Sequence, residues 1–148
     1  MNNIRVRVKK LREDAVIPEY KTPGAAGFDL VAAEDVTINA GETVTVPTGL
    51  AFEIPEGYEL QIRPRSGLSL KTPLRIANSP GTIDSDYRGE VKIIITNTGQ
   101  CDDYYNIYKG DRIAQGVIVP VMRAEFKEVD ELSETSRGYG GFGSTGMK

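Results

Sequence analysis

The sequence predicts an all-β, jelly-roll fold, and two features of its residue pattern carry this prediction. Apolar residues mostly alternate with polar ones, as in IRVRVKKL (4–11) and ETVTVPT (42–48), which is the period of a strand with one buried face. Clusters of turn-forming residues, such as NAGE, PEGY and NTGQ, separate these runs. Many short strands at this spacing are typical of a β-sandwich or barrel, and a jelly roll is the arrangement we expect.

The elements follow one another without a repeat or a linker, so the 148 residues are expected to form one β-domain over residues 1–132. A change in composition near Ser133 marks a flexible glycine-rich arm over residues 133–148. One short helix is expected over SGLSLK, residues 66–71. Strands are expected over residues 4–11, 42–48, 50–55, 58–64, 90–97, 105–108 and 113–121.

Composition limits the partners of the chain. Hydrophobic residues make up 39% of the sequence, a modest share that leaves room for an oligomer with shared buried surface. The net charge is −3 and no basic tract is present, so we expect no nucleic-acid polymer as a partner. The charged, alternating N-terminus favours neither a signal peptide nor a membrane anchor. The lone Cys101 forms no intramolecular disulfide, and a cytoplasmic location is expected.

The absence of histidine limits the chemistry. A Ser-His-Asp triad and a histidine-ligated zinc site are both excluded, and one cysteine cannot build a thiolate zinc site. Acid–base catalysis would therefore fall to a carboxylate, a lysine or a tyrosine. A metal would be bound through oxygen, which favours Mg²⁺.

Two stretches carry groups suited to phosphate. In PRSGLSLK, Arg65 offers a guanidinium fork, Ser66 a hydroxyl, and Gly67 a backbone that a ligand can approach. Ser66 as an ordinary helix N-cap explains the same residues equally well. In GDRIAQ, Gln115 is suited either to a phosphate hydrogen bond or to a structural place at a strand end. Asp29, in GAAGFDL, either orders an arginine or ends a strand.

The stretch NSPGTIDSDYRGEVKI, which starts at Asn78, has turn chemistry and then resumes a strand, so we expect a hairpin with an elaborate tip. The amide of Asn78 is a donor and an acceptor at once and suits the edge of a pyrimidine. Asp84 and Asp86 point the same way if the segment is extended, and Tyr87 could lie against a sugar ring. An Asp-rich surface turn without function is the alternative.

The glycine-rich RGYGGFGSTG, residues 137–146, satisfies G-x-G-x-x-G only by accident, because polar sequence precedes it and no helix can follow. A disordered tail is one interpretation. Arg137, Phe142, Ser144 and Thr145 are unusual for such a tail, because they supply a cation, a flat apolar face and two hydroxyls.

Taken together, these stretches resemble the five ordered motifs of the trimeric deoxyuridine triphosphatase (dUTPase) family. AAGFDLVAAEDV resembles the first, PRSGLSLK the second and NSPGTIDSDYRGEV the third, while GDRIAQGVIVPV and RGYGGFGSTG resemble the fourth and fifth. The order and the spacing are those of the family and cover most of the chain. Any one motif is weak, whereas five in order are specific.

The resemblance implies a homotrimer of jelly-roll, β-clip-like subunits with shared active sites. The family hydrolyses dUTP to dUMP and pyrophosphate with Mg²⁺, which limits uracil in DNA and supplies dUMP for thymidylate synthesis. The fifth motif closes over substrate that is bound mainly by neighbouring subunits. The metal is held chiefly by the substrate phosphates and water, with few or no direct protein ligands.

The resemblance also assigns roles residue by residue. Asp84 matches the general base, which activates a water for in-line attack on the α-phosphorus, and Asp86 is the less favoured candidate. Asp29 is expected to orient an arginine such as Arg65. The resemblance implies that phosphate is bound by Arg65, Ser66, Gly67 and Gln115. It implies that uracil and the sugar are bound by Asn78, Thr82, Ile83, Asp84 and Tyr87, with Lys92 matched in part of the family only. From the arm, the implied substrate-binding residues are Arg137, Phe142, Gly143, Ser144 and Thr145.

Two alternatives remain open from the sequence. A dCTP deaminase, or a bifunctional enzyme, uses the same fold but has a longer chain. A non-catalytic trimer that binds nucleotide to control a partner protein belongs to a different class. The match at Asp84 and the complete fifth motif favour an active dUTPase over both.

Overall fold

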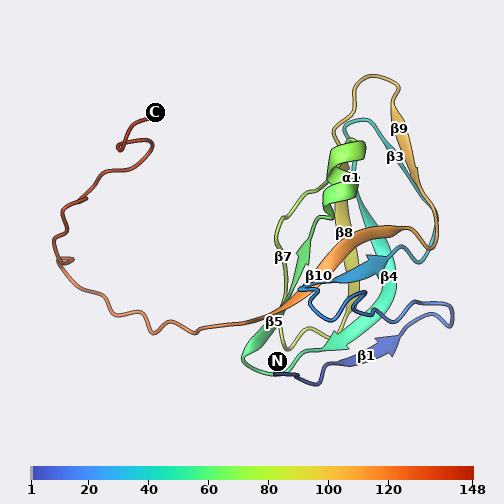
Figure 1. Cartoon of the computed structure of the whole chain (residues 1–148), viewed down its shortest axis with the longest axis horizontal. Coiled ribbons are helices and arrows are strands. Elements are labelled where there is room, and N and C mark those ends of the chain that lie inside the picture. Colours follow the sequence, from blue (N-terminus) through green and yellow to red (C-terminus); the bar gives the residue numbers. More distant parts are fainter. Residues whose placement is uncertain (1) are drawn as a thin grey trace.

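A computed structural model describes residues 2–148 and shows two four-stranded antiparallel sheets around one hydrophobic core. The first sheet has the order β1-β4-β8-β6, and Figure 1 labels β1, β4 and β8 of this sheet. Its strands are β1 (Arg7–Lys10), β4 (Thr43–Glu53), β8 (Glu90–Asn97) and β6 (Leu74–Ile76). The alternating pattern of β8, with every second residue buried, places one face of this sheet on the core.

The second sheet has the order β2-β10-β5-β7 and carries most of the candidate site. Its strands are β2 (Phe28–Val31), β10 (Arg112–Pro120), β5 (Tyr58–Arg63) and β7 (Gly81–Ile83). A two-stranded sheet pairs β3 (Val36–Asn39) with β9 (Tyr104–Ile107). The all-β, jelly-roll prediction is confirmed.

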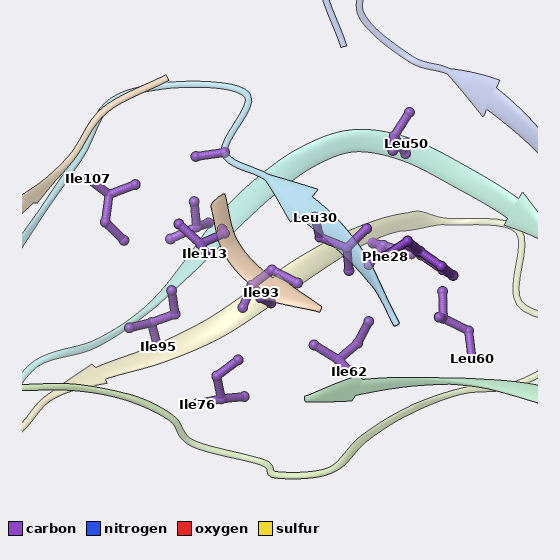
Figure 2. Packing of buried hydrophobic residues seen from close by; sticks show 14 of the residues in the cluster. Phe28, Leu30, Leu50, Leu60, Ile62, Ile76, Ile93, Ile95, Ile107 and Ile113 are labelled. Atoms are coloured by element: carbon purple, nitrogen blue, oxygen red, sulfur yellow. The ribbon is translucent and has the colours of Figure 1, made fainter. Parts of the chain in front are cut away.

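The core lies between the two sheets and consists mainly of aliphatic side chains, with Phe28 and Phe52 as its aromatic members (Figure 2). Both sheets contribute fully buried branched residues, which pack without polar atoms and each stabilise the fold by about 1.5–3 kcal/mol. The second sheet supplies Leu30, Leu60, Ile62 and Ile113, and the first supplies Leu50, Ile93 and Ile95. Apolar and polar residues alternate along the sequence because each strand turns one face toward this core.

The two strands predicted over residues 42–48 and 50–55 are one strand, β4. Gly49 separates the two predicted strands, but the chain passes through this position as an irregularity in the pairing with β8. Gly49 has a φ of +71° there, and its amide donates to the Glu90 carboxylate at 3.0 Å. The Thr48 hydroxyl donates to the carbonyl of Val91 at 2.6 Å. These bonds hold the bulge in the sheet.

One helix, α1 (Ser66–Lys71), follows β5 and covers the residues predicted for it. No helix within residues 2–148 is long and apolar enough to cross a membrane. Regular structure ends at Pro120, and residues 121–148 run away from the sheets without a helix or strand (Figure 1).

Candidate active site

Strand register brings the first group of candidate residues together on the second sheet. Gln115 on β10 lies opposite Asp29 on β2 and opposite Arg63 on β5. Its side-chain amide donates to the carbonyl of Pro64 at 2.9 Å, so the amide is held at the end of β5 where α1 begins. A β-carbon at Gly27 would lie 2.5 Å from the other end of this amide. The neighbouring glycine therefore leaves the space that Gln115 fills.

Asp29 holds two arginines. Its Oδ1 atom accepts from Arg65 Nε at 2.9 Å, and its Oδ2 atom lies 3.5 Å from Arg112 Nη1. Arg65 also donates to the main-chain carbonyl of Arg112 at 3.2 Å. The Asp29 side chain is only 19% exposed, whereas both arginines are more exposed. One partly buried carboxylate thus faces two guanidinium groups, and the cluster has a surplus positive charge.

The expected partnership of Asp29 with Arg65 is present, while Arg112 is a residue that sequence reasoning did not include in the site. Its place depends on β2 pairing with β10, with a register irregularity after Arg112. The only sequence feature that pointed to Arg112 was the GDRIAQ motif, which contains it.

The segment after β5 differs from a conventional capped helix. Arg65, with φ −91° and ψ 133°, is the N-cap residue of α1, and no side chain caps the helix. The alternative in which Ser66 is the N-cap is therefore wrong, because Ser66 is already helical. Ser66 and Gly67 are exposed, and a β-carbon at Gly67 would meet nothing within 4 Å. Packing within the chain does not require glycine at this position.

The hairpin predicted from Asn78 onward is wrong as a pairing. β7 pairs with β5, and β8 pairs with β4 and β6, so the segment between β7 and β8 crosses from one sheet to the other. Turn chemistry is visible in the sequence, but strand pairing depends on residues far along the chain. β7 lies at the edge of its sheet, so one side of its backbone faces no other strand.

The residues on either side of β7 are mostly exposed. Asn78 lies next to Gly81, where a β-carbon would be 3.4 Å from the Asn78 side-chain nitrogen. The amide of Tyr87 donates to the carbonyl of Asp84 at 3.2 Å, which closes a turn. Asp84 and Asp86 line an open depression of about 730 Å³, whose wall also includes Glu59, Arg88 and Arg123. In residues 2–148, no group of three or more carboxylate or thiol side chains is placed to hold a metal ion.

Lys92 lies on the other sheet. It is an exposed residue of β8, opposite Pro47 of β4. No hydrogen bond between residues 2 and 148 joins it to the Asp29 cluster or to the segment after β7.

The arm, within the described residues, forms hydrogen bonds only with itself. Between residues 2 and 148, the hydrogen bonds of residues 133–148 stay within that segment; for example, Arg137 Nε donates to the carbonyl of Gly140 at 2.8 Å. Phe142 is fully exposed and has a φ of +48°, a conformation uncommon for a bulky residue. Figure 1 shows this segment, in red, far from the sheets. Within a single chain, the candidate residues therefore lie in separate places, on the two sheets and on the arm.

Comparison with known proteins identifies the family. A profile of the dUTPase family matches residues 13–146. Deoxyuridine 5'-triphosphate nucleotidohydrolase from Nautilia profundicola is 56% identical over 143 residues, which cover 97% of this chain and 99% of that protein. The protein of the same name from Helicobacter pylori strain P12 is 48% identical over 144 residues, covering 97% and 98%.

Solved structures agree with these relatives. A mutant dUTPase of Staphylococcus bacteriophage 80alpha with dUpNHpp has a TM-score of 0.91 and 35% identity, and the match covers 98% of this chain and 100% of that one. A mutant dUTPase from phage phi11 of S. aureus, described with a structural Mg(II) ion, has a TM-score of 0.79 and 33% identity, with 86% and 98% covered. Sequence and structure agree over nearly the full length, and the chain belongs to the dUTPase family.

Proposed function

We propose that this chain is a dUTP diphosphatase, which hydrolyses dUTP to dUMP and pyrophosphate. Its family and the name shared by its relatives support this activity. The structural observation that carries the proposal is the pair of guanidinium groups, Arg65 and Arg112, that Asp29 holds beside α1. An oriented guanidinium fork binds two phosphate oxygens at once, so the cluster suits a triphosphate.

The phosphate-binding residues are Arg65, Ser66, Gly67 and Gln115. Arg65 and Gln115 are both fixed by hydrogen bonds to the protein, which lowers the entropy lost when they bind an anion. The exposed Ser66 hydroxyl and the backbone at Gly67, in the first turn of α1, are open to a ligand.

Uracil is read by the side-chain amide of Asn78 and by the backbone of β7 with Asp84. The unpaired edge of β7, at Thr82 and Ile83, supplies donors and acceptors that copy a base-pairing partner. Cytosine would leave polar groups mismatched, which costs about 10⁴-fold in discrimination. Tyr87 packs under the deoxyribose and leaves no space for a 2′-hydroxyl, with Lys92 as a further contact.

Asp84 is the general base. Its exposed carboxylate directly follows β7 and accepts a proton from a water molecule. The water oxygen forms a bond to the α-phosphorus, while the bond from that phosphorus to the pyrophosphate oxygen breaks. Asp86 has the same side chain and lies on the same depression, but it does not match the base in the family motif.

The proposed cofactor is Mg²⁺, held mainly by the substrate phosphates and water. In the Asp29 cluster, the carboxylate contacts two arginines and is not free to serve as a metal ligand. When bound, the ion would neutralise phosphate charge and orient the triphosphate. The phage phi11 relative, described with a structural Mg(II) ion, supports Mg²⁺ as the choice of metal.

The active form is a homotrimer in which the flexible arm, residues 133–148, completes a site on other copies. The side chains of Met122, Phe126 and Leu132, on the segment that leaves the sheets, are exposed and available for burial against other copies. On binding, Phe142 stacks on uracil and the arm closes over the phosphates. Arg137, Gly143, Ser144 and Thr145 supply the donors for the γ-phosphate.

The reaction limits uracil in DNA and supplies dUMP for thymidylate synthesis. We place it in the cytoplasm, which agrees with the single free cysteine, Cys101. The names of the relatives do not support a dCTP deaminase or a purely regulatory nucleotide binder.

The test is pyrophosphate release with Mg²⁺ from dUTP, dTTP, dCTP and UTP in parallel. We expect rapid release from dUTP alone. Release from several nucleotides would contradict the reading of uracil by Asn78 and of deoxyribose by Tyr87. Binding of dUTP without any release would favour the regulatory binder, and ammonia release from dCTP would favour the deaminase.

A further inference from the structure

The ring of Tyr87 is fixed by main-chain groups that follow it in the sequence. Its hydroxyl donates to the carbonyl of Glu90 at 2.9 Å. The ring therefore lies across Gly89, where an added β-carbon would sit 2.6 Å from Cζ and 2.9 Å from Cε1 of Tyr87. Atoms at these separations overlap, so the observed ring position requires the absence of a side chain at Gly89.

The backbone conformation does not explain this glycine. Gly89 is not among the glycines with a positive φ, so other residues could adopt its conformation. The remaining reason for glycine at position 89 is that the Tyr87 ring occupies the space that a side chain would need. Tyr87 is 44% exposed, so a β-carbon at position 89 would displace the ring toward solvent instead of disrupting the core.

The acceptor for the hydroxyl is itself held in the first sheet. Glu90 begins β8 and pairs with Ala51 of β4. Its carboxylate accepts from the amide of Gly49 at 3.0 Å, in the bulge of β4. The position of the Tyr87 ring is thus tied to the sheet through Glu90, although the segment around it is exposed.

We propose that Gly89 and the main-chain carbonyl of Glu90 are positioning groups that set the preference of this enzyme for deoxyribose over ribose. Gly89 acts through Tyr87 and does not contact the substrate. The inference rests on the proposed function, in which the Tyr87 ring excludes a 2′-hydroxyl. A ring held in one place excludes one additional oxygen, whereas a displaced ring leaves room for it.

The test is the ratio of kcat/KM for UTP to kcat/KM for dUTP, measured by pyrophosphate release. In Gly89→Ala this ratio is expected to rise about tenfold or more, which is the discrimination that one close packing contact supplies. Tyr87→Phe keeps the ring and removes its bond to Glu90, so a smaller rise is expected. Gly24→Ala is the matched control, because a β-carbon there meets nothing within 4 Å, and its ratio should equal that of the wild type.

A second measurement separates positioning from a general structural role. In a Tyr87→Ala background, adding Gly89→Ala should leave the ratio unchanged, because the ring through which Gly89 acts is absent. An unchanged ratio in Gly89→Ala alone, or an equal change with and without the ring, would overturn the inference. A wild type that does not hydrolyse dUTP would instead overturn the proposed function, so the two failures are distinguishable.

Discussion

The Asp29 carboxylate faces two guanidinium groups, and this ratio leaves the Asp29 cluster with a surplus positive charge. Arg65 is bound through Nε at 2.9 Å, while Arg112 lies farther away at 3.5 Å. A single carboxylate orders both side chains and neutralises only one of them. The arrangement keeps a positive charge in position before an anion arrives.

Asp29→Asn should therefore lower kcat/KM for dUTP by about ten- to a hundredfold, because a neutral amide anchors two guanidinium groups poorly. Steady-state kinetics would measure the loss. Glu34→Gln is the matched control, since it removes a carboxylate bonded to Arg12 at 2.7 Å outside the site. Equal activity losses in the two variants would contradict a specific role for Asp29.

Asp84→Asn should keep dUTP binding and lower kcat by about 10²- to 10⁴-fold, because the amide preserves the shape of the carboxylate but cannot accept the proton. Equilibrium binding and turnover would be measured side by side. Asp86→Asn is the control in the same depression and should remain much more active. Full activity in Asp84→Asn, with the loss in Asp86→Asn, would reverse the assignment.

At the scale of the element, the runs with an alternating pattern were predicted, although β4 was divided in two, and four short strands were missed. The strand predicted over residues 90–97 and the helix predicted over residues 66–71 have the observed bounds of β8 and α1. The strands β2, β3, β6 and β7 have three or four residues each, too few to display an alternating period. Their pairing comes from tertiary contacts that local sequence does not encode.

The arm is the element whose role is easiest to separate from the fold. Deleting residues 137–148 should leave the thermal unfolding midpoint nearly unchanged, because the deleted segment hydrogen-bonds only within residues 133–148. Turnover of dUTP should fall to a small fraction of the wild-type rate if the arm closes over the site, as we propose. Removing only residues 147 and 148 is the control and should have little effect. Unfolding of the larger deletion would make the arm structural.

At the scale of the whole molecule, the sequence motifs predicted a set of site residues that lie apart in the single chain. The Asp29 cluster forms within the second sheet, but Lys92 lies on the first sheet and Phe142 lies far out on the arm. A linear motif shows which residues are present, whereas the contact between Arg112 and Asp29 depends on strand register. Because these candidate residues lie far apart within one chain, we expect other copies of the chain to complete the site.

Complementation between two inactive variants tests this claim most directly. Asp84→Asn lacks the base but has an arm, and the chain without residues 137–148 lacks the arm but has Asp84. If different copies supply these parts, mixed oligomers formed by coexpression should recover about a quarter of the wild-type rate, because random assembly at equal amounts gives roughly that share of complete sites. If one chain supplies both parts, the mixture should remain as inactive as the two variants alone, and the account of a shared site would be contradicted.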